Sequence, residues 1–169
     1  MSGGYMTIGI ATRKFVAADS RLSFGTTDAP LTVGKIFTRR GGGLFVTAGD
    51  SRRTRHFEVA MKSGKEPKEL EILEDESFEA AVLMPDSELI VYDTNFAPFP
   101  VGEDCIVIGS GCTVARSWML NGADEITAIR RCIEVDTGCG YPIVVAYLNG
   151  RVDLIDENGN VTPAKKARR

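Results

Sequence analysis

Histidine and paired cysteines are scarce in this sequence. His56 is the sole histidine, and none of the four cysteines (Cys105, Cys112, Cys132 and Cys139) belongs to a Cys-x-x-Cys pair. These absences argue against a Cys/His zinc site and against a Ser-His-Asp triad, and no metal or organic cofactor is implied. Isolated cysteines fit a reducing cytosol. Any hydrolytic chemistry must therefore use a base other than histidine.

Long apolar runs and an excess of basic residues are also missing. No apolar run comes near the ~18–20 residues that span a bilayer, and residues 1–6 lack the basic start and apolar core of a signal peptide. We therefore expect a cytoplasmic protein with no membrane partner. The net charge of −3 gives no reason to expect nucleic acid as the main partner, because nucleic-acid binders usually carry a basic face.

The length and composition are those of one globular domain. The chain has 169 residues, of which 43% are hydrophobic and 25% charged, and these are ordinary values for a globular protein. We expect an N-terminal extension or propeptide at residues 1–6, a single domain at 7–158 and a basic flexible tail at 159–169.

Short apolar segments bounded by glycine, proline and polar residues predict strands. They lie at residues 7–12, 15–18, 35–38, 43–48, 78–84, 88–93, 105–108, 141–148 and 152–155. Helical spacing and capping residues predict a helix that opens at 49–51 and runs to about residue 63, and further helices at about 113–120 and 124–135. Residues 19–31 and 65–77 are expected to be loops. Because strands and helices are segregated along the chain, we expect an α+β fold with helices outside two stacked antiparallel sheets.

A cluster of arginines occupies the start of the first predicted helix. Arg52, Arg53 and Arg55 follow the candidate capping residues Asp50 and Ser51. Such a run is more typical of a solvated or subunit-facing helix surface than of a nucleic-acid patch.

Five local patterns occur in a fixed order over residues 7–148. They are TIGIA at 7–11 followed by VAADSR at 16–21, VGKIF at 33–37, VTAGD at 46–50, IGSG at 108–111 and DTGCG at 136–140. Together they resemble the proteasome β-subunit and HslV-like threonine proteases of the N-terminal-nucleophile hydrolase superfamily, including the short members encoded by bacteriophages.

The resemblance implies a fold, an activity and an assembly. The implied fold is a four-layer αββα sandwich of two antiparallel sheets flanked by helices. The implied activity is that of a threonine-type endopeptidase subunit in a self-compartmentalising, ring-shaped homo-oligomer, where an AAA+ unfoldase feeds in unfolded polypeptide. If a phage encodes the chain, its location is the host cytoplasm or the virion, and its partners include phage structural proteins.

The same resemblance gives roles to three polar residues. Thr7 would be the nucleophile, with its own α-amine as the base. Such an amine titrates near ~7.7–8.0, which suits a general base at neutral pH. Lys35 would lie beside the Thr7 hydroxyl and favour loss of its proton, and Asp19 would hold Lys35 charged and oriented.

Further residues would complete the site by resemblance. Ser110 and Asp136 would hydrogen-bond near the α-amine, and Cys139 stands where the family often has serine. The oxyanion requires backbone N–H donors, and an alignment through the Gly49-Asp50 pair places Val46 at the donor position.

An active site of this kind requires that Thr7 becomes the first residue. While residues 1–6 remain attached, the Thr7 nitrogen is an amide and cannot act as a base. A catalytically inactive proteasome-like structural or assembly protein, perhaps of a phage particle, is therefore the alternative function. An amidase acting on small molecules is a third.

Each candidate residue also has a structural interpretation. Thr7 can be an ordinary β-branched strand residue, and Lys35 with Asp19 can be a structural ion pair. Ser110 can serve as a helix N-cap, and Asp136 can simply end its helix.

Overall fold

The computed structural model describes residues 7–24, 27–30, 35–69, 71, 73 and 75–164. The predicted extension at 1–6, the motif residues 33–34 and the end of the tail at 165–169 lie outside this range. Among the described residues, none of the helices has the length and apolar character needed to cross a bilayer.

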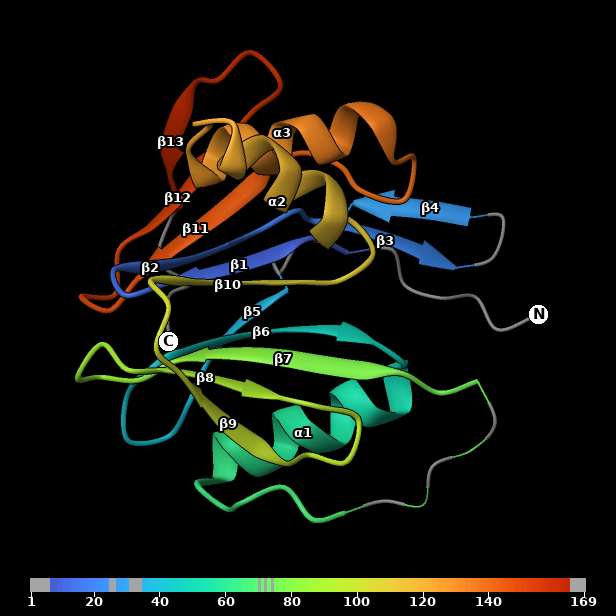
Figure 1. Cartoon of the computed structure of the whole chain (residues 1–169), viewed down its shortest axis with the longest axis vertical. Helices are drawn as coiled ribbons and strands as arrows, with labels where there is room; N and C mark the ends of the chain where they lie inside the picture. Colours follow the sequence, from blue (N-terminus) through green and yellow to red (C-terminus); the bar gives the residue numbers. More distant parts are fainter. Residues whose placement is uncertain are drawn as a thin grey trace.

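Two large antiparallel sheets dominate the described part of the chain (Figure 1). The six-stranded sheet has the order β10-β1-β2-β11-β12-β13, with strands Gly9–Thr12 (β1), Phe15–Ala18 (β2), Cys105–Ile108 (β10), Ile143–Tyr147 (β11), Val152–Ile155 (β12) and Val161–Pro163 (β13). The five-stranded sheet has the order β5-β6-β7-β8-β9, with strands Ile36–Thr38 (β5), Leu44–Gly49 (β6), Phe78–Leu83 (β7), Leu89–Tyr92 (β8) and Pro98–Val101 (β9). Arg21–Phe24 (β3) and Thr27–Pro30 (β4) form a separate hairpin.

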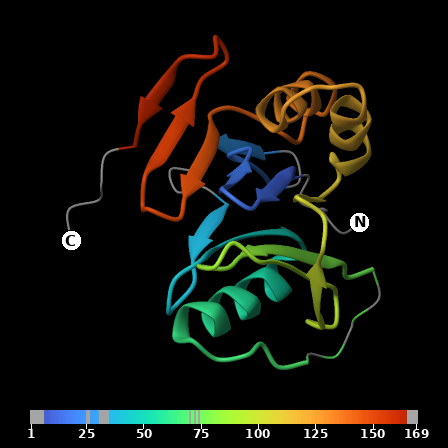
Figure 2. The ribbon, with the colours of Figure 1, turned by 60° about the vertical axis from the view of Figure 1, so that its left-hand side comes forward.

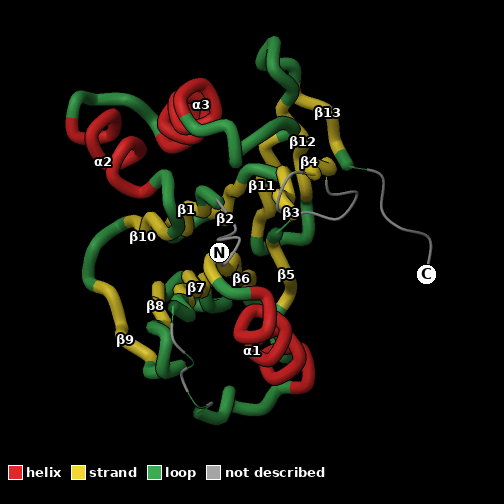
Figure 3. Tube along the Cα trace, turned by 90° about the vertical axis from the view of Figure 1, so that its right-hand side faces the viewer, coloured by secondary structure: helices red, strands yellow, loops and turns green. Residues whose placement is uncertain are grey.

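The two sheets stack face to face, and helices cover their outer faces. Helices α2 (Cys112–Leu120) and α3 (Glu125–Val135) lie over the six-stranded sheet, and α1 (Ser51–Ser63) lies under the five-stranded one (Figures 1 and 2). The same order of layers is visible from the side in Figure 3. The predicted α+β class with two antiparallel sheets is confirmed, and the arrangement is that of a layered sandwich.

Side-chain size differs between the layers. The cluster between the sheets is rich in small residues, namely Ala11, Ala18, Ala48, Ala81 and Ala146. The outer face of the five-stranded sheet instead packs Phe45, Phe57, Phe78, Tyr92 and Phe96 beneath α1. Because successive residues of a strand point to opposite faces, one strand supplies both clusters. Alanines on the inner face let the sheets approach closely, and aromatic residues on the outer face fill the wider space under the helix.

Four short strands were not predicted. Residues 19–31, expected to be a loop, contain β3 and β4. In β9, Pro98 and Pro100 obscured the strand pattern, but this strand lies at the sheet edge, where a missing N–H is tolerated. The polar strand β13 pairs with β12. The sheet therefore continues to Pro163, past the domain boundary expected at residue 158.

Helix α1 begins and ends at the residues that the sequence favours. Asp50 is its N-cap, and its carboxylate accepts hydrogen bonds from the backbone N–H groups of Arg52 and Arg53. Gly64 ends the helix in the left-handed conformation, at φ 75°. Asp50 rather than Ser51 therefore caps the helix.

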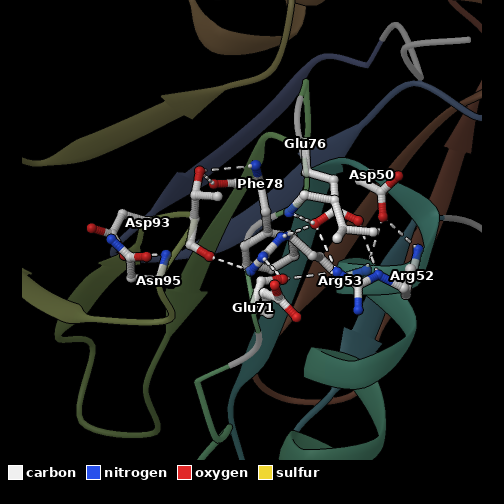
Figure 4. Close-up of polar contacts among 10 residues, drawn as sticks. Asp50, Arg52, Arg53, Glu71, Glu76, Phe78, Asp93 and Asn95 are labelled. Carbon is white, nitrogen blue, oxygen red and sulfur yellow. Dashed lines mark hydrogen bonds and ion pairs between the residues drawn. The ribbon is translucent and has the colours of Figure 1, made fainter. Parts of the chain in front are cut away.

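Arg53 is fully buried, which corrects the expected solvated surface at this position. Its guanidinium donates to the Glu71 carbonyl at 2.8 Å, to the Thr94 carbonyl at 2.6 Å and to Glu76 Oε2 at 3.0 Å. Figure 4 shows these contacts, together with those that Arg52 makes to Glu76. The network ties Glu71, Glu76 and the segment after β8 to the first turn of α1. The sequence missed this role because three closely spaced arginines resemble a solvated surface.

Candidate active site

Thr7, Lys35 and Asp19 form a buried, hydrogen-bonded row. Lys35 Nζ lies 3.0 Å from Thr7 Oγ1 and 2.8 Å from Asp19 Oδ1. Thr7 is 2% exposed, Lys35 6% and Asp19 0%. A lysine side chain is almost never this buried unless it is paired. The ammonium therefore contacts both a carboxylate and a hydroxyl oxygen.

The order of the strands explains why Thr7, Asp19 and Lys35 lie together. Thr7 leads into β1 and Asp19 follows β2, and these two strands form an antiparallel pair, so both residues lie at the same end of the six-stranded sheet. The Asp19 N–H donates to the Ile8 carbonyl at 3.2 Å. Lys35 precedes β5 of the opposite sheet and reaches across the sandwich. The row therefore joins the two sheets at one end.

The Asp19 carboxylate is fixed by the backbone as well as by Lys35. It accepts N–H groups from Ile8 and Arg21, each at 3.1 Å, and from Gly140 at 3.2 Å. Burial raises the pKa of the Asp19 carboxyl above its ordinary value, while the charge of Lys35 and the hydrogen bonds from Lys35, Ile8 and Arg21 oppose that rise. Asp19 is thus held in one orientation from which it positions the lysine.

Ser110 and Asp136 lie on the nitrogen side of Thr7. The Thr7 N–H donates to Ser110 Oγ at 3.3 Å, and the Ser110 hydroxyl donates to Asp136 Oδ2 at 3.3 Å. Asp136 is the C-cap of α3 and also accepts the Gly138 N–H at 2.9 Å. Ser110 is not the N-cap of α2, since Gly111 takes that position without a side-chain cap. All five predicted side chains therefore meet in one chain of hydrogen bonds.

The turn that delivers Ser110 requires glycine. Gly109 has φ 94°, and a Cβ built on it would lie 2.0 Å from the Thr7 carbonyl oxygen. Any side chain would therefore both strain the backbone and separate this turn from Thr7. The Gly109 N–H donates to Glu79 Oε2 at 3.1 Å, a contact that the sequence did not predict.

The sheet register does not fit the predicted oxyanion role of Val46. Asp50 N donates to the Ser77 carbonyl at 2.7 Å, and every second residue of an antiparallel strand turns its N–H toward the same neighbour. Val46, four residues earlier, therefore directs its N–H toward β7, where Ala81 lies opposite. Its side chain is fully buried between the sheets.

The same alternation points to another donor. Thr47 and Gly49 direct their N–H groups to the opposite edge of β6. The pairing of Ile36 with Val46 directs the Thr47 N–H at Lys35, so Gly49 is the candidate donor beyond the part of this edge that β5 covers. The Ala48 methyl group lies next to the Gly109 turn, 3.4 Å from a Cβ built there. The part of β6 that extends beyond β5 therefore lies near Thr7. The alignment through Gly49-Asp50 selected Val46, whose N–H points to the other edge of β6.

The cysteines near the site are neutral thiols. Cys132 Sγ lies 3.3 Å from the Gly111 carbonyl, and Cys139 Sγ lies 3.7 Å from Asp136 Oδ2. Burial raises the pKa of Cys132 to about 11 and that of Cys139 further still. Neither is thus a thiolate nucleophile near neutral pH. Across the described ranges, no group of three or more His, Cys, Asp or Glu side chains is placed to hold a metal ion.

The geometry therefore joins Thr7, Lys35, Asp19, Ser110 and Asp136 and adds Glu79. The register of β6 favours the Gly49 N–H over that of Val46 as the candidate oxyanion donor. Comparison with protein-family models and with curated proteins found no match to this chain.

Proposed function

We propose that the protein is a threonine-type endopeptidase subunit in which Thr7 is the nucleophile once the residues that precede it are removed. The observation that carries this proposal is the buried Lys35 ammonium, which lies 3.0 Å from Thr7 Oγ1 and 2.8 Å from Asp19 Oδ1. A lysine charge held against a threonine hydroxyl favours the alkoxide over the alcohol. A purely structural ion pair would not need a hydroxyl as its third member.

The reaction follows from this arrangement. Cleavage of the bond between Met6 and Thr7 turns the Thr7 amide into an α-amine, which takes the proton from Oγ1. Oγ1 then bonds to the scissile carbonyl carbon, the C–N bond breaks, and the leaving amine takes that proton. Water, deprotonated by the same α-amine, hydrolyses the resulting ester and releases Thr7 unchanged.

The remaining residues serve this sequence of steps. Ser110, linked to Asp136, lies where it accepts a hydrogen bond from the Thr7 nitrogen and can orient the free amine. The N–H group of Gly49 is the donor that we assign to the tetrahedral oxyanion. Such a donor stabilises the charge that develops in the transition state.

The layered arrangement supports the N-terminal-nucleophile hydrolase fold that the sequence resembles. By the same resemblance, we propose that subunits assemble into a ring that encloses the sites. An AAA+ unfoldase would supply unfolded polypeptide to this chamber. An isolated subunit is then expected to have little activity.

Covalent labelling tests the proposal. A chain that begins at Thr7 is expected to form an ester adduct with a peptide β-lactone, located at Thr7 by mass spectrometry, and to degrade unfolded casein. Thr7→Ala is expected to do neither. Thr12→Ala is the matched control, since Thr12 is also buried but hydrogen-bonds locally to the Phe15 carbonyl at 3.1 Å. An adduct on Thr7→Ala, or none on the unaltered chain, contradicts the proposal.

One observation favours the structural or assembly alternative. With residues 1–6 attached, the Thr7 nitrogen is a peptide N–H that donates to Ser110, so the hydrogen bonds of the site are complete without catalysis. This alternative predicts no adduct and stable association with other structural proteins.

A further inference from the structure

Glu79 lies at the same end of the sandwich as Thr7 but on the opposite sheet. It is the second residue of β7 and pairs with Ala48 of β6. Its neighbours Phe78 and Ala80 face α1, whereas Ala81 faces the other sheet. Because side chains alternate along a strand, Glu79 shares the inner face with Ala81. Ala81 and Leu83, on the same face of β7, are buried, whereas Glu79 is exposed.

The Glu79 carboxylate crosses to the six-stranded sheet. Its Oε2 accepts the backbone N–H of Gly109 at 3.1 Å. Gly109 follows β10 and turns the chain at φ 94°, so close to Thr7 that an added Cβ would lie 2.0 Å from the Thr7 carbonyl oxygen. The next residue is Ser110, whose hydroxyl oxygen accepts the Thr7 N–H. Glu79 thus holds the turn from which Ser110 reaches the Thr7 nitrogen.

Two side chains of the five-stranded sheet therefore support Thr7 from two sides. Lys35 contacts the Thr7 hydroxyl directly. Glu79 contacts the turn that carries Ser110. We propose that Glu79 is a positioning residue, which keeps Ser110 Oγ within hydrogen-bonding reach of the Thr7 nitrogen. Its effect on catalysis rests on the proposed function, but its effect on geometry does not.

A carboxylate that merely interacts with solvent at the end of β7 would behave differently. Alanine at such a position leaves the Gly109 turn unchanged, whereas a positioning carboxylate acts through its acceptor oxygen. Glutamine keeps a carbonyl oxygen as acceptor but removes the charge. Comparing Glu79→Ala with Glu79→Gln therefore separates the hydrogen bond from the charge. Glu88→Ala is the matched control, because Glu88 is exposed beside the β7–β8 turn.

The first measurement uses the full chain and requires no activity. Amide hydrogen exchange is followed by NMR at Gly109 and Thr7. We expect Glu79→Ala to speed exchange of both amides by about tenfold or more, because both lose a fixed hydrogen-bond geometry. Glu79→Gln is expected to stay within about threefold of the unaltered chain, and Glu88→Ala to change neither amide. Unchanged exchange in Glu79→Ala would overturn the inference.

The second measurement uses the chain that begins at Thr7. We expect Glu79→Ala to lower kcat for peptide hydrolysis about tenfold and to leave KM within about twofold, since a displaced catalytic group slows the reaction more than it weakens substrate binding. Glu79→Gln is expected to restore most of kcat. An unchanged kcat, a change confined to KM, or no rescue by glutamine counts against the positioning role. If the unaltered chain hydrolyses nothing, the proposed function fails, and the exchange data alone decide the role of Glu79.

Discussion

Replacing Lys35 by methionine in a chain that begins at Thr7 is expected to lower the rate of Thr7 acylation by about 10²–10³-fold, which is typical for the loss of one preorganised electrostatic group. Lys35 Nζ lies 3.0 Å from Thr7 Oγ1 in a site where Lys35 is only 6% exposed. Water cannot replace a charge at that depth as it could at the surface. The rate of β-lactone labelling measures the effect directly.

Two controls separate chemistry from stability in this experiment. Methionine leaves Asp19 buried without its cation, so thermal unfolding must show that the variant is folded at the assay temperature. Lys62→Met removes a lysine from the partly exposed surface of α1 and is expected to label at the unaltered rate. A folded Lys35→Met variant that labels as fast as the unaltered chain would show that Lys35 is a structural partner of Asp19 and nothing more.

Replacing Arg53 by methionine is expected to lower the free energy of unfolding by about 3–5 kcal/mol, the usual cost of removing one partner from a buried ionic network. Arg53 is 0% exposed. Its loss leaves the carbonyls of Glu71 and Thr94 without these donors, and Glu76 without one of its two arginines. Urea unfolding at neutral pH measures the change.

Arg55 provides the matched control on the same helix. Its side chain is 75% exposed and lies 3.8 Å from Glu58, so Arg55→Met is expected to change stability by less than about 0.5 kcal/mol. If both variants lost the same free energy of unfolding, helix propensity rather than the buried network would explain the loss of stability.

Acid titration gives a second measure of the same network. The pKa of Glu76 falls from 4.5 to about 2, mainly through its hydrogen bond from Arg52, with smaller contributions from the Leu73 N–H and Arg53. A carboxylate with a lowered pKa stabilises the fold fully above its unfolded value and loses that contribution as the pH falls toward the folded value. The stability difference between the unaltered chain and Glu76→Gln should therefore shrink between about pH 4.5 and about pH 2.

The fold was largely predictable where local patterns are strong. Short apolar segments bounded by polar residues located β7 and β8, and Asp50 with Gly64 marked the ends of α1. The missed strands are short and lie where local signals conflict with strand formation. Pro98 and Pro100 argue against a strand until its edge position is known, and β13 depends on its pairing with β12.

The site was predictable only in part, because its residues come from both sheets. The motifs named Thr7, Lys35 and Asp19, and the structure brings these three side chains together. No local pattern distinguishes a buried arginine from its solvated neighbours, so Arg53 was missed. Glu79 was missed because its contact joins strands of different sheets.

The oxyanion donors show a different limit of sequence reasoning. Which N–H groups of β6 face the site depends on its hydrogen-bonding partner, and a shift of one residue exchanges the two edges. Val46 and Thr47 are neighbours in the sequence but present their N–H groups to opposite edges. Only the pairing with β7 decides between them.

The intact mass of the protein purified from its native source, with N-terminal sequencing, tests the central claim most directly. The account predicts a chain that begins at Thr7, because only a free α-amine can take the proton from Oγ1. A population in which all or most chains keep residues 1–6, or lose only Met1, would contradict it. Thr7 would then have no base, and the structural role would be the better explanation of the buried Thr7–Lys35–Asp19 row.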